Sequence, residues 1–254
     1  MPQPRTYRTH ALILRHRDFG EADRLITVLT PQHGKFDVLA KGVRKPTSTK
    51  TGHLELYTHS ELLIARGSSL DLVTQAQLLN PYLALHEDLL RGAYASYCVE
   101  LLDRFTTVEE DARHDALFEL LDATFERLCH DPDVMRVARY YEMQLLDLVG
   151  FRPQLQTCVV TQAPIEPRDQ YFSFAEGGVV SPEGAAHLSG LVALPLVTLK
   201  LMRHFQRTRD YRRLTDLHIT PQEHSDFERV MLGFIRHTLE ARLRSIDFIR
   251  LIQR

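Results

Sequence analysis

The feature that most limits the possible folds is a change in hydrophobic pattern at Asn80-Pro81. Before this point, short apolar segments rich in Leu, Ile, Val and Thr are separated by turn residues, as is typical of β-strands. After it, apolar residues recur at the 3.6-residue period of an amphipathic helix. The sequence therefore predicts an α+β chain, with a β domain over 1–80 and a helical domain over 81–254.

The first 80 residues contain five segments with the pattern of a strand, and turn chemistry separates them at Phe19-Gly20, 31–34 and 41–52. The expected strands are 10–16, 24–30, 35–40, 54–65 and 70–78. Five strands fit a small closed or nearly closed barrel, and one such barrel is the OB-fold, whose common ligands are oligonucleotides. The strand count fits an SH3-like barrel equally well, so both architectures stay open at this point.

The helical domain is expected to be interrupted once. Helices are predicted at 82–105, 112–129, 134–149, 195–207 and 221–239, with a terminal turn near 246–252 and an acidic loop at 109–111. Between them, 151–184 is rich in Pro and contains Gly177-Gly178, which breaks a helical pattern. We interpret 151–184 as an irregular insert with a small hairpin over 171–180.

Composition limits where the chain works. It has no run of about 18 apolar residues, so we expect no membrane span. Its N-terminus lacks the apolar stretch of a secretory signal. Cys98, Cys129 and Cys158 form no paired framework, which favours reduced thiols. The expected location is the cytoplasm, and the family resemblance described below implies association with the nucleoid.

Charge is distributed unevenly although the net charge is only −2. Residues 1–80 hold 11 Lys and Arg against 7 Asp and Glu, a net charge of +4. Residues 81–150 carry −9 and residues 151–254 carry +3. A bound phosphate feels charges only within about 10 Å at 0.1 M salt, so the local excess matters more than the total. This segregation favours an anion-binding surface on the β domain.

The sequence lacks the common catalytic motifs. It contains no Walker A motif, no GxGxxG after a strand, no GxSxG and no HExxH. We therefore expect neither an enzyme nor a small-molecule substrate. A nuclease would need clustered carboxylates and a divalent metal, and adding EDTA would test that alternative.

The predicted DNA-binding residues are basic side chains at strand ends and in the turn after the third strand. They are Arg15, Arg17, Arg24, Lys35, Lys41, Arg44, Lys45 and Lys50. Contacts to a phosphate backbone need such cations beside open backbone. Tyr7, Phe19, Phe36 and Tyr57 are nearby aromatics for base stacking, although Phe36 is expected to face the barrel core. A flexible basic loop of this kind can wrap a nucleic-acid backbone, and the alternative is a merely solvated loop with neighbouring carboxylates.

A second basic stretch lies at Lys200–Arg213, where Arg203 and Arg207 share one face of a predicted helix. It fits either a plain amphipathic helix end or a surface for an acidic peptide. Arg203 and Arg207 are the candidate residues for such a partner.

Several motifs together resemble one family. The run Gly20-Glu21-Ala22-Asp23-Arg24, then Leu29-Thr30, Gly34-Lys35 and 40–44, follow the order and spacing of the RecO family of bacterial recombination mediators. Residues 150–155 are similar to the family's GFxPxL, and 243–248 resemble its terminal helix. The resemblance covers the whole chain.

The resemblance implies an N-terminal OB-fold, a C-terminal helical domain and a role without catalysis. Family members bind single- and double-stranded DNA, anneal strands and work with RecR. They bind the acidic C-terminal tail of single-stranded-DNA-binding protein and help to load RecA in gap repair. The rival hypothesis is a protein-interaction scaffold whose barrel binds a protein and touches DNA only incidentally.

One departure from the family concerns zinc. Many members carry CxxC…CxxC in the insert, whereas the corresponding positions here are Cys158, Thr161, Ser181 and Gly184. One thiolate and a nearby His187 are too few ligands for a tetrahedral site. We therefore expect no metal and no other cofactor, and an insert held instead by its hairpin and by packing of Phe172, Phe174 and Val179.

Overall fold

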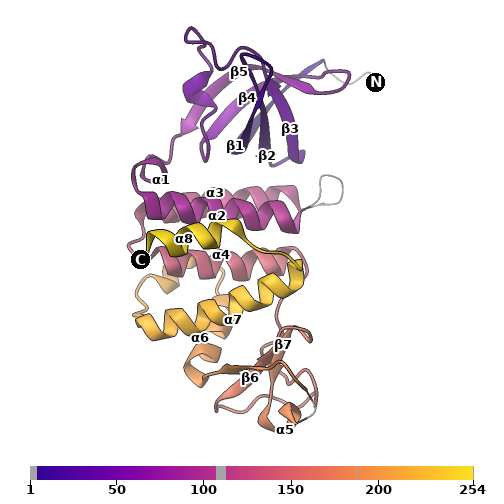
Figure 1. Cartoon of the computed structure of the whole chain (residues 1–254), viewed down its shortest axis with the longest axis vertical. Helices are drawn as coiled ribbons and strands as arrows, with labels where there is room; N and C mark the ends of the chain where they lie inside the picture. Colours follow the sequence, from indigo (N-terminus) through magenta and orange to yellow (C-terminus); the bar gives the residue numbers. More distant parts are fainter. Residues whose placement is uncertain (1–4, 107–112, 187, 254) are drawn as a thin grey trace. The chain divides into compact units, whose positions relative to one another are not determined.

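The computed structural model describes residues 5–106, 113–186 and 188–253. The predicted acidic loop at 109–111 and His187 lie outside the described residues. The chain forms two compact units (Figure 1). One contains 1–130 and 252–254, and the other contains 131–251. The last barrel strand ends at Asn80, and the helices between there and His130 belong to the same compact unit as the barrel.

Five strands close into a barrel in the first unit. They are β1 (Thr6–Phe19), β2 (Asp23–Thr30), β3 (Gly34–Ala40), β4 (His59–Ala65) and β5 (Asp71–Asn80). Their order around the barrel is β1-β2-β3-β5-β4, with β3 and β5 parallel and the other pairs antiparallel. This Greek-key order is that of the OB-fold, which decides between the two barrels that the strand count had left open.

The longest strand closes the barrel because it bends. Residues 6–12 of β1 pair with β4, and 12–19 pair with β2. A bulge between Ile13 and Arg15 changes the register at the bend, as bulges do in barrels. The predicted strand over 54–65 is too long, because its first part is a turn in which Tyr57 has a φ of 59° and β4 begins only at His59.

The barrel is buried on two sides. Its interior is filled by small and branched side chains: Ala11, Ile13, Ile26, Val28, Val38, Ala40, Val43, Leu54, Leu62, Ile64 and Val73. Leu12, Leu14 and Leu29 lie outside this cluster and are also buried, and helix α3 (His114–His130) packs against β2 and β3. Burial on both faces explains why β1 and β2 contain continuous apolar runs instead of alternating.

Two further helices complete the first unit. Asp88 caps α2 (Leu89–Phe105) by accepting hydrogen bonds from the Leu90 and Arg91 amides, and it separates α2 from the short α1 (Ala84–Glu87). The helix predicted over 82–105 is therefore two helices. Side-chain capping of this kind satisfies amides that have no partner within the helix.

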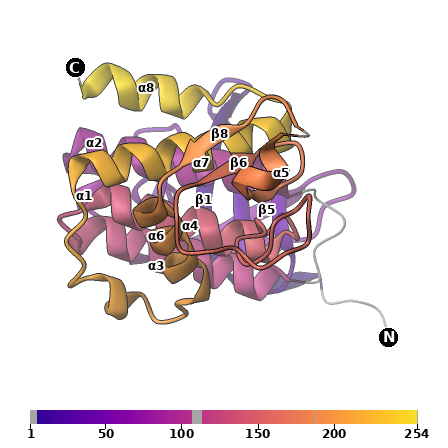
Figure 2. The ribbon, with the colours of Figure 1, turned by 90° about the horizontal axis from the view of Figure 1, so that it is seen from below.

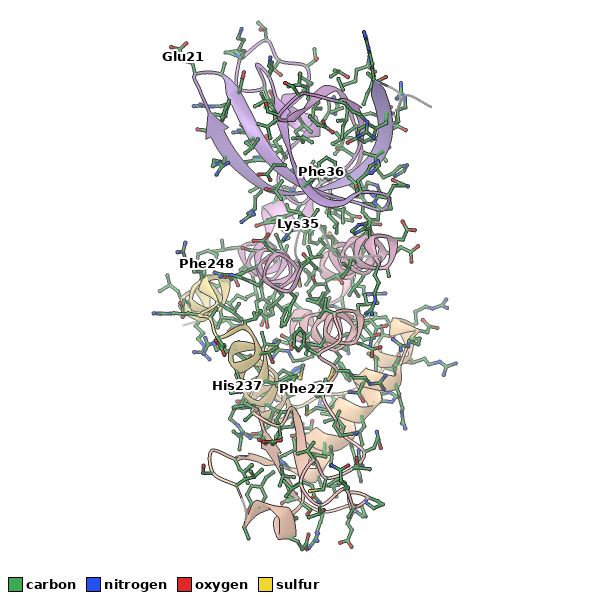
Figure 3. The ribbon with its side chains drawn as sticks, turned by 90° about the vertical axis from the view of Figure 1, so that its right-hand side faces the viewer. Glu21, Lys35, Phe36, Phe227, His237 and Phe248 are labelled. Carbon is green, nitrogen blue, oxygen red and sulfur yellow. The ribbon has the colours of Figure 1, made fainter. Side chains whose placement is uncertain are left out.

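Lys35 joins the barrel to α2 (Figure 3). Its side chain is 9% exposed, and Nζ donates to the Asp103 carboxylate at 2.8 Å and to the main-chain oxygens of Asp103 and Thr106, each at 2.9 Å. A cation is favourable at the C-terminal end of a helix, where carbonyl groups have no helical partner. All three acceptors belong to the protein itself, so the Lys35 ammonium is not free for the DNA contact that the sequence predicted.

A second set of hydrogen-bonded polar side chains links the barrel to α3. His59 Nδ1 lies 2.9 Å from Asp122 Oδ1, and the Tyr82 hydroxyl donates to the same oxygen at 2.6 Å. His10 Nδ1 lies 3.0 Å from His59 Nε2 on the outer side. Burial alone would raise the pKa of the Asp122 carboxyl, but the hydrogen bonds from His59 and Tyr82 outweigh it and hold that pKa below its usual value.

The second unit packs helices around α4 (Val134–Leu148). Helices α6 (Leu196–Arg207) and α7 (Pro221–Leu239) pack against α4 and against each other, α8 (Arg244–Ile252) follows α7, and the short α5 (Pro182–Ala185) lies in the insert. Arg136, buried at the start of α4, donates to Asp131 at 2.6 Å and to the main-chain oxygens of Thr215 and Leu217. The helices predicted at 134–149, 195–207 and 221–239 are present within a residue at each end.

The insert is a small sheet in this unit (Figure 2). Strands β6 (Gln170–Ser173) and β7 (Gly178–Val180) form the predicted hairpin, with Tyr171 opposite Val180. A third strand, β8 (Val192–Leu194), pairs with β6 and was not predicted. The sheet therefore reaches past residue 184, the predicted end of the insert.

We predict that Lys35→Met destabilises the protein by about 3–5 kcal/mol, because it leaves two carbonyls without their cation and the Asp103 carboxylate with Arg15 alone. Denaturant unfolding measures the effect. Lys41→Met, at an exposed position, is the matched control and should change stability by no more than about 0.5 kcal/mol. Equal effects of the two substitutions would contradict the assigned role.

A pH dependence follows from Asp122. Because its folded-state pKa is lower than its unfolded value of about 3.9, the carboxylate contributes stability above that pH and loses it as pH falls through the folded value. Asp122→Asn should cost about 1–3 kcal/mol at pH 7, and the difference from the parent should shrink below about pH 4. A difference that stays constant down to pH 3 would contradict the assignment.

Candidate nucleic-acid interface

Two arginines meet at one end of the barrel, beside the β1–β2 turn. The Arg24 side chain from β2 and the Arg44 side chain from the segment after β3 both reach the Asp18 carboxylate, at 3.6 and 3.3 Å. Arg24 also lies 3.9 Å from Glu55. Glu21, in the same turn, marks this end in Figure 3 and lies opposite the end occupied by Lys35.

The basic segment after β3 is anchored to the barrel. Val43 and Leu54 belong to the barrel core, with exposures of 0% and 1%. The Gly42 amide donates to Asp23 Oδ1 at 2.7 Å, and the Arg44 amide donates to the Ala22 carbonyl at 3.0 Å. Contacts at Gly42, Val43 and Arg44 therefore tie the start of the predicted loop to the barrel. The apolar residues hold the segment so that its cations point outward.

Lys41, Arg44 and Lys45 are exposed on this anchored segment. Gly42 has a φ of +65°, in the left-handed region that only glycine adopts without strain, and the turn needs it there. Together with Arg24, these side chains form what we call the tip surface. The tip surface thus brings together four cations, three from the segment after β3 and one from the start of β2.

Arg15 and Arg17 lie on the outer face of β1. With His16, Leu25, Thr27 and Asp37 they line a hollow of about 290 Å³. Arg15 also contacts the Asp103 carboxylate at 3.0 Å, while its side chain stays 58% exposed. The two arginines therefore extend the positive region from the tip surface along β1.

Lys50 faces another side of the barrel. Its Nζ donates to the Val73 carbonyl at 3.2 Å, and burial lowers the pKa of its ammonium. It lines a groove of about 380 Å³ over β4 and β5 together with Arg8 and His53. The structure thus divides the eight predicted residues among the tip surface, the β1 face, this groove and the internal site of Lys35.

Of the four aromatic candidates, Phe19 is the exposed one, at 46%. It ends β1, next to the tip surface. Phe36 packs against the barrel core as expected. The Tyr7 hydroxyl donates to Asp71, and the Tyr57 ring stacks edge-on against Phe125. These three rings are engaged within the fold, which leaves Phe19 as the one suited to stacking.

The candidate pair for an acidic peptide has unequal members. Arg203 Nε donates to the Leu155 carbonyl at 2.8 Å, and burial lowers the pKa of its guanidinium. Arg207, near the end of α6, is exposed and lies 3.4 Å from His204 Nδ1. Arg203 therefore holds the insert to α6, and Arg207 alone presents a free face.

Sequence reasoning missed a second basic site on the same unit. Arg229, Arg236 and Arg250 line a hollow of about 510 Å³ with apolar surface from Met135 and Leu232. Arg229 is already bonded to Asp226 and to the Ala193 carbonyl. The spacing of seven between Arg229 and Arg236 places both on one helical face and is the signal that would have found them.

No three His, Cys, Asp or Glu side chains gather closely enough to hold a metal ion among the residues that the structure describes. Within the same residues, no helix has the length and apolar character needed to cross a membrane.

Comparisons with known proteins agree along the whole chain. Residues 3–82 match the family model described as Recombination protein O N terminal, and residues 86–247 match Recombination protein O C terminal. A protein of Roseiflexus sp. named DNA repair protein RecO is 38% identical over 96% of this chain and 85% of its own length. Proteins with the same name from Heliobacterium modesticaldum and Dehalococcoides mccartyi strain 195 are 35% and 32% identical, over 98% and 94% of this chain and 91% and 93% of their own lengths.

A five-stranded OB-like barrel joined to a helical part, with these matches, defines a protein of DNA repair and recombination. More narrowly, the chain belongs to the RecO family, which confirms the resemblance found in its motifs.

Proposed function

We propose that this protein is a recombination mediator that works by binding DNA and proteins and not by catalysis. In gap repair of the RecF type it holds single- and double-stranded DNA on the barrel, anneals strands and, with RecR, helps to load RecA onto DNA covered by single-stranded-DNA-binding protein. The observation that carries the proposal is the tip surface, where Arg24, Lys41, Arg44 and Lys45 gather beside an exposed Phe19.

The ion pairs of the tip surface suit an exchange of partners. Arg24 and Arg44 share Asp18 at 3.3 to 3.6 Å, and Asp18 is 60% exposed. Surface pairs of this kind contribute only about 0–1 kcal/mol. A DNA phosphate can therefore replace the carboxylate at little cost. In the absence of DNA, the same carboxylate keeps both guanidinium groups in place.

Binding of this type is independent of sequence. The cations contact phosphates, and Phe19 offers a ring against which any base can stack, worth about 1–3 kcal/mol per base. The affinity should depend steeply on salt, because each neutralised phosphate releases counterions. Arg15 and Arg17 extend the track along β1.

We further propose that the second unit receives the acidic C-terminal tail of single-stranded-DNA-binding protein. The hollow at Arg229, Arg236 and Arg250 combines cations with apolar surface, which suits an acidic peptide carrying apolar residues. Arg236 lines this hollow, and its Nε is buried without a hydrogen-bond partner among the described residues. The surface at Arg207 is the alternative site.

The central prediction concerns charge reversal on the tip surface. Lys41→Glu/Arg44→Glu/Lys45→Glu should weaken binding of labelled oligo-dT at least tenfold and reduce the log–log salt slope by about 2, since each single-strand phosphate contact contributes about 0.7. Fluorescence anisotropy over a salt series measures both quantities, and circular dichroism checks the fold.

The matched control is Lys200→Glu/Arg207→Glu/Arg213→Glu, which reverses three exposed charges of the second unit. It should leave oligo-dT binding within about twofold of the parent, because cations that touch no phosphate add nothing to the salt slope. Loss of binding in this control instead of the tip variant would place the DNA surface on the second unit. Absence of binding by the parent protein would favour a protein-interaction scaffold.

A second experiment separates the two candidate sites for the tail. Arg236→Glu/Arg250→Glu should weaken binding of a labelled acidic peptide with a C-terminal Phe at least tenfold, whereas Lys200→Glu/Arg207→Glu should have little effect. Two lost charge-assisted bonds are expected to cost about 1.5–3 kcal/mol each. The opposite ranking of the two variants would move the tail site to α6.

A further inference from the structure

Two tight turns of the insert meet at one sulfur atom. The first turn runs from Cys158 to Ala163 and is closed by hydrogen bonds between the main chains of these two residues and from Gln162 to Cys158. The second follows β7 and starts at Ser181, whose hydroxyl accepts from the Gly184 amide at 3.2 Å. Both turns direct main-chain N–H groups at Cys158 Sγ, from Thr161 at 3.4 Å and from Ser181 at 3.3 Å.

Position 184 completes the arrangement. A β-carbon added to Gly184 would lie 3.0 Å from Cys158 Sγ. Positions 161, 181 and 184 therefore all approach the Cys158 sulfur, and the four positions form two pairs with two residues between the members of each pair. This is the spacing with which two turns hold a tetrahedral metal through four thiolates.

The residues at these positions do not fit a metal. Cys158 supplies the one thiolate, and Gly184 supplies no ligand. The Ser181 hydroxyl is engaged with the Gly184 amide, and the Thr161 hydroxyl accepts from the Ala163 amide at 3.4 Å. Neutral hydroxyls are not ligands that structural zinc sites use. The frame of a four-ligand site is thus retained with a donor set that cannot fill it.

The Cys158 sulfur is the atom that both turns contact. Cys158 is 0% exposed. Burial raises the pKa of its thiol, but hydrogen bonds from Thr161, Ser181 and Val160 outweigh it and bring that pKa to about 6. In metal sites, amides of the surrounding turns donate to the ligand atoms and fix them. Here the amides of both turns converge on one buried acceptor.

We propose that the insert is a metal-free derivative of a four-thiolate module, in which the Cys158 sulfur replaces the metal as the atom that joins the two turns. The two turns keep the spacing and the close approach of a four-ligand site, so that cysteines placed at 161, 181 and 184 would bind one zinc ion. This inference is independent of the proposed DNA and protein partners.

The first test uses hydrogen exchange on the full chain. Cys158→Ala should reduce the protection of the Thr161 and Ser181 amides at least tenfold, and Cys158→Ser, which keeps an acceptor, should retain part of it. Cys98→Ala is the matched control, because Cys98 is also 0% exposed and lies in the other unit. It should leave both amides protected. Unchanged protection in Cys158→Ala would overturn the role of the sulfur.

The second test uses metals. The purified parent should contain less than a tenth of a zinc ion per chain, and EDTA should not change its Tm. Thr161→Cys/Ser181→Cys/Gly184→Cys should bind one Co²⁺ with the absorption of tetrahedral thiolate coordination, and Zn²⁺ should displace it and raise Tm. Stoichiometric zinc in the parent, or a folded triple variant that binds no metal, would overturn the proposal.

A variant with fewer substitutions keeps the proposal testable if the triple variant does not fold. Thr161→Cys/Ser181→Cys leaves Gly184 in place and supplies three thiolates with one open position. It should bind Co²⁺ more weakly than the triple variant but with the same thiolate signature. Adding Cys158→Ala to it should abolish that signature, and a signature that persists would show that the cobalt binds elsewhere.

Discussion

The buried ammonium of Lys35 is the interaction on which the first unit depends. It brings β3 to the C-terminal end of α2 by bonding the Asp103 carboxylate and two main-chain carbonyls. With Arg15 on the same carboxylate, two barrel cations are tied to one helix. This contact fixes one end of the barrel against the helices. The cations that remain at the opposite end, beside the β1–β2 turn, are the ones available to a ligand.

The contrast between buried and exposed cations explains how one small domain can be stable and still bind a charged ligand. A buried charge must keep all its partners, because removing one leaves an uncompensated group in a poorly hydrated place. An exposed pair such as Arg44 and Asp18 is held weakly and can separate without cost to the fold. The anchored segment after β3 supplies the rigidity that an exposed pair cannot, because Val43 and Leu54 fix its backbone.

Much of the fold could be predicted because it depends on local pattern. The switch at Asn80-Pro81, the helices α4, α6 and α7 and the hairpin of the insert all carry their signal in the chain itself. The OB topology was not accessible in this way, since it rests on the parallel pairing of β3 with β5 and on one strand with two partners. β8 has three residues, too few for a period to be recognised.

The functional residues were less predictable for a physical reason. Lys35 and Lys41 are both lysines near the ends of β3, and only the position of α2 makes one internal and the other exposed. Arg203 likewise differs from Arg207 because the insert lies against it. Burial by segments that are distant in sequence cannot be recognised in the local sequence pattern. Family resemblance predicted a role in DNA repair, and the structure shows which cations are buried or bonded within the fold and which are exposed.

The most direct test of the account is hydrogen exchange of the whole chain with and without oligo-dT. We predict that added protection is confined to the end of β1, the β1–β2 turn and residues 41–45, with little change around Lys50 or α6. Protection centred on the second unit, with none at the tip surface, would contradict the central claim that this end of the barrel holds DNA.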